Sequence, residues 1–337
     1  MPKKIILIVG AGILCLSILI GLVYKKQSQG EEVEPEYVFT YAENQPAGYP
    51  TTLGAYRFSE LVYERTKGRI KIVVYPDGAL GDEVSVIEQL QFGGIDFARA
   101  SVMSLGEFEE KMNVLQLPYL YRSSKHMWNV LEGEIGEEFM DSLKPSGLKA
   151  LSWYDAGTRN FYTTTPVKRL EDMKGKKIRV AESELMQDMV TDLGGTPVPL
   201  AYSEVFSALE TGAIDGAENN LPSYVFTDHY KVAKYLILDG HNQIPELQLA
   251  SMSSWNQLSE SDQQLMKECS LESAVYERKL WKEQEEKSRM FAEKNGVEIM
   301  ELSSEEISRF REKVRPLYLK FSGEYQDVID EIESVKD

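Results

Sequence analysis

Apolar and polar residues alternate along the chain with two different spacings. Over residues 50–66 the apolar side chains recur every three or four positions, which predicts a helix with one buried face. Ile70, Ile72 and Val74 then occupy every second position, which predicts a strand that ends at a turn, residues 76–78. Helical and strand-like segments keep alternating further along, an order typical of α/β layers with parallel strands.

Two segments, residues 83–98 and 204–217, share one pattern: a helix, a glycine-containing turn and a strand opened by Ile-Asp. The recurrence fits either an ordinary helix–strand joint that appears twice by chance, or two lobes of similar build around a shared cleft. Ligands of open α/β sheets bind at the carboxyl ends of the strands. The second interpretation therefore makes the residues after each Ile-Asp binding candidates: Arg99, Ser101, Glu218 and Asn219.

The C-terminal third of the chain predicts one long helix. Ser259 and Asp262 have the spacing of a helix cap, and residues 261–294 contain no glycine or proline. Such a helix would be about 50 Å long, more than one small lobe can cover, so we expect it to lie across two lobes. An edge strand at residues 297–302 and a final helical region broken at Pro316 should follow.

The N-terminus predicts export from the cytoplasm. Lys3 and Lys4 precede an apolar run at residues 5–23 that is long enough, as a helix, to cross a bilayer core. Because the run is long for a cleaved signal and no small-residue cleavage site follows it, we expect residues 1–26 to be a signal or, preferably, an uncleaved membrane anchor. Lipidation at Cys15 is disfavoured, since Leu14 precedes it. Residues 27–36 predict a flexible tether to an extracytoplasmic body.

The composition of the chain excludes several classes of binding partner and cofactor. The chain of 337 residues has 54 Asp and Glu against 37 Lys and Arg, a formal net charge of −17, which argues against nucleic acid and anionic lipid as partners. Two cysteines rule out a disulfide framework. The three histidines share no ligand spacing, and nucleotide-binding and nucleophile motifs are missing. We therefore expect no metal site, no cofactor and no catalytic residue.

One segment departs from this acidity. Residues 159–179 hold seven basic and two acidic residues, a local charge of +5. Most of these belong to a basic turn around Gly175, but Arg159 and Arg179 lie at predicted strands. A partly buried arginine needs a carboxylate partner, and its planar fork suits bidentate capture of one. The partner is either a Glu or Asp of this chain or the carboxylate of a ligand, and the spacing leaves both open.

Several motifs occur in a fixed order along the chain. They are Gly157-Thr158-Arg159, residues 170–180 (LEDMKGKKIRV) and residues 204–219, which end in Asp-Gly-Ala-Glu-Asn. With Gly81-Asp82-Glu83 and residues 94–97 they cover about residues 37–325. As an ordered set they resemble the extracytoplasmic solute-binding proteins of TRAP transporters, the DctP-type family.

The resemblance implies a fold and a ligand class. The fold is a two-lobed, periplasmic-binding-protein-like α/β clam shell with a long helix bracing both lobes. Lobe I would comprise residues 37–156 plus 245–284, and lobe II residues 157–244 plus 285–337. The ligand would be an organic acid whose carboxylate meets Arg179, assisted by Arg159 and Asn219, with Tyr202 packing on the ligand.

Acidic residues at expected cleft positions indicate which acid. Compared with sialate-binding members, this chain carries Glu43, Glu83, Glu182 and Glu246 there. Surface charge is the alternative interpretation, and we expect at least two of the four to lie in the cleft. Carboxylates accept hydrogen bonds from hydroxyl groups, which suits a polyhydroxylated monoacid. Residues 45–50, 217–224 and 244–246 look most like members that bind hexuronates such as glucuronate and galacturonate, except that Gln45 stands where these often have histidine. The remaining candidates are Gln45 and Ser101 for hydroxyl groups and Tyr49 for an apolar face.

We therefore expect a monomeric extracytoplasmic protein that captures a C6 sugar acid and delivers it to TRAP permease membrane subunits. Alternatives are a dicarboxylate or sialate ligand, and an anchored sensor that reports its ligand to a signalling kinase. An exported sugar-acid lyase or hydrolase using two glutamates is disfavoured, because no catalytic motif is present.

Overall fold

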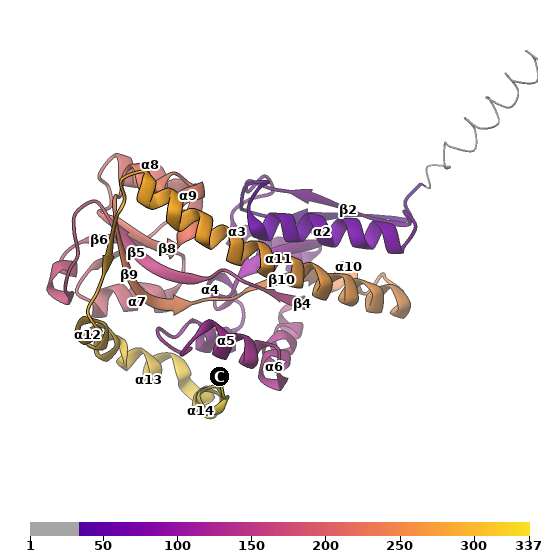
Figure 1. Cartoon of the computed structure of the whole chain (residues 1–337). Coiled ribbons are helices and arrows are strands. Elements are labelled where there is room, and N and C mark those ends of the chain that lie inside the picture. Colours follow the sequence, from indigo (N-terminus) through magenta and orange to yellow (C-terminus); the bar gives the residue numbers. More distant parts are fainter. Residues whose placement is uncertain (1–33) are drawn as a thin grey trace, which may run out of the picture.

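The computed structural model describes residues 34–337, so the predicted signal or anchor (residues 1–26) and residues 27–33 of the predicted tether lie outside the described residues. From residue 34 onward the chain forms two β-sheets with helices around them (Figure 1), as expected of an α/β protein. No helix in this range is both long enough and apolar enough to cross a membrane.

The first sheet has five strands, in the spatial order β2 (Ile70–Tyr75), β1 (Tyr37–Ala42), β3 (Phe97–Ser101), β10 (Glu246–Ser251) and β4 (Leu148–Tyr154). β1 is parallel to β2 and β3, whereas β10 is antiparallel to β3 and β4. The helices in the segments around this sheet are α2 (Pro50–Arg65), α3 (Glu83–Phe92), α4 (Val102–Leu105), α5 (Ser124–Leu131), α6 (Glu134–Ser142) and α10 (Met252–Trp255).

The second sheet has six strands, in the order β11 (Glu298–Glu301), β9 (Tyr235–Gln243), β5 (Thr158–Thr163), β8 (Gly216–Asn220), β6 (Lys177–Val180) and β7 (Thr196–Pro199). β6 is parallel to β7 and β8, and β5 is antiparallel to β8 and β9. Its helices are α7 (Glu184–Asp192), α8 (Val205–Glu210) and α9 (Leu221–Phe226). Short 3₁₀ helices are η1 (Glu110–Gln116), η2 (Lys144–Ser146), η3 (Leu170–Met173), η4 (Tyr202–Glu204), η5 (His229–Lys231) and η6 (Gly323–Tyr325).

The two segments that share a sequence pattern lie in different sheets. α3 leads through Gly93 (φ +75°) to β3, and α8 leads through Gly212 (φ +71°) to β8. Both glycines adopt the left-handed backbone that favours glycine after a helix. The repeated pattern therefore marks one helix–strand joint in each of two lobes.

A long helix connects the two lobes. α11 (Glu260–Lys294) has 35 residues and begins at Ser259, whose hydroxyl accepts a hydrogen bond from Asp262 N. It packs on α2 and β4 beside the first sheet and on α9 beside the second. Figure 1 shows it running across both sheets. Met266 is buried with the first sheet and Ala292 with the second, so the predicted brace is confirmed.

The C-terminal helices follow the predicted pattern. α12 (Ser304–Val314) ends just before Pro316, which begins α13 (Pro316–Ser322), and α14 (Gln326–Ser334) follows. α12 and α13 pack on α7 of the second lobe. They and α14 also reach the first-sheet segments, since the Tyr318 hydroxyl donates to Pro118 O (2.8 Å) and His126 Nε2 lies 2.9 Å from Ile332 O. The chain end thus contacts both halves of the molecule.

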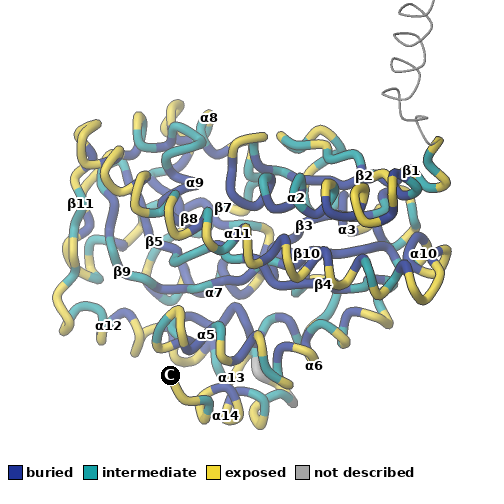
Figure 2. The backbone as a smooth tube through the Cα atoms, turned by 45° about the vertical axis from the view of Figure 1, so that its right-hand side comes forward, coloured by how far each residue is buried: buried dark blue, intermediate teal, exposed yellow. Residues whose placement is uncertain are grey.

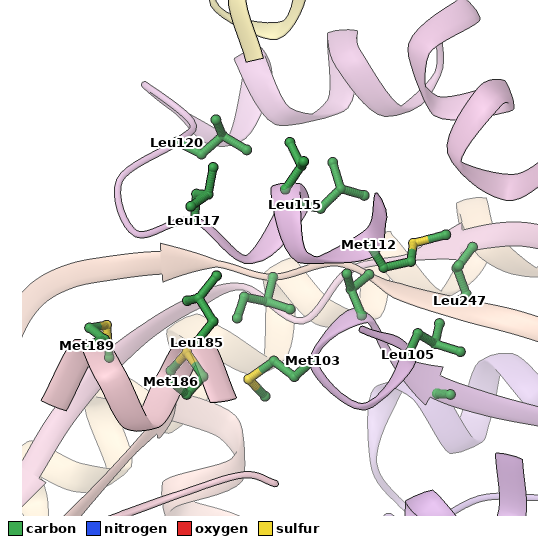
Figure 3. Close-up of a cluster of buried hydrophobic side chains, with 14 of the residues drawn as sticks. Met103, Leu105, Met112, Leu115, Leu117, Leu120, Leu185, Met186, Met189 and Leu247 are labelled. Carbon is green, nitrogen blue, oxygen red and sulfur yellow. The ribbon is translucent and has the colours of Figure 1, made fainter. Parts of the chain in front are cut away.

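One buried apolar cluster runs from lobe to lobe (Figure 3). Its members include Met103, Leu115, Leu185 and Met186. Hydrogen bonds accompany it, because Ser183 Oγ donates to Gln116 Oε1 (2.9 Å) and Asn242 Nδ2 donates to Gln116 O (2.7 Å). Figure 2 shows the buried backbone concentrated in the strands of both sheets. The two lobes therefore share a buried apolar cluster and hydrogen bonds.

Gly157, in the connection between β4 and β5, packs closely against α11, and a substitution there tests this packing. It has φ +61°, and a Cβ there would stand 2.7 Å from Nε1 of the buried Trp281. We expect Gly157→Ala to lower the free energy of unfolding by about 2–4 kcal/mol, because backbone strain and overpacking add.

The matched control is Gly175→Ala. Gly175 has φ +74°, but a Cβ there would meet nothing within 4 Å. This variant should lose about 1 kcal/mol, from backbone strain alone. Urea-induced unfolding measures both losses, and equal losses would contradict the close packing of Gly157 against α11.

Candidate functional site

A cavity of about 410 Å³ lies between the lobes. Its first-lobe lining includes Asn44, Glu83 and Ser104, and its second-lobe lining includes Arg179, Glu182 and Tyr202. Most of these residues lie at or just beyond the carboxyl ends of β1, β3, β6 and β7, and Glu83 begins α3. The cavity is therefore at the end of the sheets where α/β proteins bind ligands.

Arg179 is buried in the second-lobe wall of the cavity. It lies on β6 between β7 and β8, and its Nε and Nη2 donate to Leu200 O (3.0 and 2.7 Å). No carboxylate between residues 34 and 337 forms an ion pair with it, and burial lowers its pKa. Of the two partners that the sequence left open, an internal carboxylate is not seen in the described chain. Nη1 stays available to an anion.

Arg159 is also buried, and four of its five N–H groups donate within the protein. Its Nε and Nη2 donate to the two carboxylate oxygens of Glu218 (2.5 and 2.9 Å), and Nη1 donates to Asn219 Oδ1 (3.0 Å). Asn219 Oδ1 accepts a second hydrogen bond from Asn220 N (2.8 Å). Arg159 therefore orients Asn219, whose Nδ2 has no hydrogen-bond partner in the described part of the chain and can serve as a donor.

A buried histidine extends this network away from the cavity. His241 Nδ1 lies 2.7 Å from Asp239 Oδ2, and its Nε2 lies 3.4 Å from Glu218 Oε2. Burial lowers the pKa of His241, but the two carboxylates outweigh it and raise the pKa to about 9. Burial raises the pKa of Glu218, but Arg159 and His241 outweigh it and lower the pKa to about 2. Both groups are therefore charged near neutral pH, in a row of alternating charges.

Asp239 and His241 are not among the residues predicted from the sequence. The available signal was their spacing, because residues two apart on a strand share a face. A lone histidine in a strand has no ligand spacing, however, and its partner Glu218 comes from another strand, β8.

Three of the four predicted glutamates gather around Arg99 in the first lobe. Its Nε lies 3.1 Å from Glu43 Oε1, and its Nη1 lies 2.9 Å from Glu83 Oε1 and 3.2 Å from Glu246 Oε1. Nη2 also donates to Glu43 and to Asn44 Oδ1. The side chain of Arg99 is 1% exposed. The position of Arg99 on a strand end had marked it as a candidate, but its role as the centre of this cluster was not predicted.

Glu182 and Tyr202 line the cavity from the second lobe. Glu182 is exposed, whereas Tyr202 is half-buried. The Tyr202 hydroxyl donates to Gln45 Oε1 of the first lobe (3.3 Å). Gln45 and Tyr202 are thus bonded to each other across the cleft.

Tyr49 and Ser101 lie somewhat apart from the cavity. Tyr49 is buried beside Phe226 and Trp281, with its hydroxyl 2.8 Å from Ser223 Oγ. It therefore joins α2, α9 and α11. Ser101 caps α4 through its hydroxyl, and its backbone N–H donates to Glu83 Oε1 (3.0 Å). Among residues 34–337 no group of three or more His, Cys, Asp or Glu side chains could hold a metal ion.

Two lobes, a cavity at their strand ends and a buried arginine facing it define a binding protein of the clam-shell class. The chain belongs to the DctP family, "Bacterial extracellular solute-binding protein, family 7", whose family model matches residues 41–324. The family and fold implied by the sequence motifs are therefore confirmed. A binding protein, rather than an exported sugar-acid enzyme, is confirmed with them.

Individual relatives agree with this family. A "Solute-binding protein" of Chromohalobacter salexigens is 37% identical over 293 residues, 87% of each chain. A solved TRAP periplasmic solute-binding protein from Xanthobacter autotrophicus with bound β-D-galacturonate has a TM-score of 0.86 and 38% identity, covering 88% of this chain and 100% of that one. Another, from Pseudomonas putida with bound D-glucuronate, has a TM-score of 0.87 and 35% identity, covering 89% and 98%.

The charge on His241 can be tested through stability. We expect His241→Gln to lower the free energy of unfolding by about 3 kcal/mol near pH 6, because two buried carboxylates lose the cation between them. The raised pKa means that the charged form stabilises the fold fully below the usual value of 6.5 and that this contribution is lost as the pH rises through about 9. The difference between the wild-type protein and the variant should therefore shrink over that range.

His229→Gln is the matched control. His229 is also buried, but burial lowers its pKa to about 3, so it is neutral throughout this range. Because its folded-state pKa lies below the usual value of 6.5, the stability lost in this variant should grow by under about 1 kcal/mol as the pH rises from 6 to 9, opposite in direction to His241→Gln. Urea-induced unfolding near pH 6 and near pH 9 measures both variants, and a pH-independent loss for His241→Gln would contradict a charged histidine.

Proposed function

We propose that this protein captures a C6 sugar acid, a hexuronate such as D-glucuronate or D-galacturonate, outside the cytoplasm. The observation that carries the proposal is Arg179, a buried guanidinium in the cavity wall without a carboxylate partner among the described residues. A ligand carboxylate would supply the missing partner in a bidentate, charge-assisted pair. Asn219 lies on the neighbouring strand, two residues beyond the residue paired with Arg179, and would add a donor.

The first-lobe wall suits the other end of a sugar acid. It includes Glu83, one of the glutamates bonded to Arg99, together with Ser104, and carboxylate and hydroxyl groups form hydrogen bonds with the hydroxyl groups of a ligand. The cavity of about 410 Å³ is in the usual range for small-molecule sites. The hexuronates in the two solved relatives support this ligand class.

The setting of this binding site follows from the family and the leader. We propose that the protein is held at or beyond the outer face of the membrane by residues 1–26 and the tether. There it would act as a monomer and deliver its ligand to TRAP permease membrane subunits. The boundaries of the two lobes, with residues 285–337 in lobe II, stay a prediction.

Arg179→Ala should abolish hexuronate binding. Removing one member of a desolvated charge pair costs several kcal/mol, so we expect affinity for D-glucuronate and D-galacturonate to fall by at least about 100-fold. Isothermal titration calorimetry measures the change. Arg169→Ala is the control, because Arg169 lies in the same basic segment but its side chain is 67% exposed, and this variant should bind like the wild type.

A ligand panel separates the substrate from the alternatives. Succinate and sialate should bind more weakly than both hexuronates, and tighter binding of either would overturn the proposed substrate without changing the family. Unchanged hexuronate affinity in Arg179→Ala would overturn the proposed site. Co-purification with a sensor kinase instead of permease subunits would overturn the proposed transport role.

A further inference from the structure

Glu246 differs from the other glutamates around Arg99 in having a free oxygen. Its Oε1 accepts from Arg99 Nη1 (3.2 Å), whereas its Oε2 makes no hydrogen bond within residues 34–337. Both oxygens of Glu43 accept from Arg99. Those of Glu83 accept from Arg99, the Ser101 N–H and the Ser104 hydroxyl. Among these three carboxyl groups, Glu246 is therefore the one with an oxygen free to form a new hydrogen bond.

The cluster also holds more negative than positive charge. Three carboxylates surround one guanidinium, and all four side chains are at most 17% exposed. If all three carboxyl groups were ionised, the cluster would carry a charge of −2 away from water, an arrangement that low polarity disfavours strongly. A shared proton relieves this repulsion. Because the Arg99 N–H already occupies Oε1 of Glu246, the proton has an unoccupied place on Oε2.

The charges around Glu246 also favour a proton on its carboxyl group. Burial, together with Glu83 and Glu43, raises the pKa of Glu246 to about 8, although Arg99 and Arg159 oppose the shift. Tyr41, Tyr49 and Glu277 are the other titratable groups that interact with it. Burial raises the pKa of each of these three groups, and none of them is a cation that could compensate the excess of carboxylates.

We propose that Glu246 binds the ligand as a neutral acid, donating a hydrogen bond from Oε2 to an oxygen of the sugar, and that it takes up a proton when the lobes close on the ligand. This inference rests on the proposed function, because it needs a hydroxylated acid whose carboxylate is held on Arg179. The proton comes from the solvent and forms the O–H bond on Oε2, and no bond of the ligand is made or broken.

Closure supplies the driving force for proton uptake. Opening of the lobes would hydrate Glu246 and move its pKa towards the usual value of 4.5. In the closed molecule its pKa is about 8. A group whose pKa is raised in the closed state favours closure fully below the open-state pKa, and this contribution is lost as the pH rises through the closed-state pKa. Ligand affinity should therefore weaken as the pH rises from about 5 to about 8.

The experiment measures D-glucuronate and D-galacturonate binding by calorimetry between about pH 5 and pH 8. This range stays below the pKa of His241, about 9, so the charge of that residue does not change. We expect the wild-type Kd to rise by up to about tenfold per pH unit, the limit for one coupled proton. Titrations near pH 7 in buffers of different ionisation enthalpy should show uptake of up to one proton per ligand bound.

Glu246→Gln is the deciding variant, since glutamine keeps a neutral donor in the same place. We expect its Kd to be independent of pH and its proton uptake to vanish. Glu298→Gln, at an exposed position of the edge strand β11, should behave like the wild type. A pH-dependent Kd retained in Glu246→Gln, or a wild-type protein that binds without proton uptake, would overturn the inference while leaving hexuronate capture intact. Absence of hexuronate binding at every pH would overturn the proposed function and this inference together.

Discussion

Three arginines are buried beside the cleft, and a guanidinium is stable away from water only where other groups compensate its charge. Arg99 is compensated by three glutamates and Arg159 by Glu218, whereas Arg179 has the neutral carbonyl of Leu200. An uncompensated buried charge costs several kcal/mol once water is excluded. Under the proposed function, the carboxylate of a ligand would supply the missing compensation, and Arg179 would then favour closure on the ligand over closure of the empty protein.

This preference requires that Arg179 cannot reach a carboxylate of its own. Its strand β6 lies between β7 and β8, and two of its nitrogens are fixed by Leu200 O, which follows β7. Glu218, the carboxylate one strand away, is already held by Arg159 and His241. The row from Asp239 to Arg159 therefore does more than orient Asn219. It also occupies the Glu218 carboxylate, which therefore does not pair with Arg179.

Structural features that depend only on residues close together in the sequence can be predicted from the sequence. The long helix α11 follows from a capped run without glycine or proline, and the break at Pro316 follows from the missing N–H of proline. That Arg179 needs a carboxylate partner follows from a charged residue within an apolar strand, whereas the ligand as that partner is implied only by the family resemblance. The contacts of Glu43, Glu83 and Glu246 do not follow in this way, because the three come from separate segments and meet only at Arg99. The same limit applies to Tyr49, whose hydroxyl meets Ser223 of the other lobe, because such a partner is decided by how the lobes close.

The charged groups that line the cleft differ from the charge of the chain as a whole. The net charge of −17 is a sum over the sequence, whereas the cavity lining combines one available guanidinium, Arg179, with carboxyl groups of both lobes, among them Glu83 and Glu182. A ligand with a carboxylate at one end and hydroxyl groups at the other matches both walls. A dicarboxylate of similar length would bring its second charge against the glutamate cluster, and like charges held out of water repel by several kcal/mol. Under the proposed function, the second-lobe wall would accept the carboxylate of either a sugar acid or a dicarboxylate, and the first-lobe wall would favour the sugar acid.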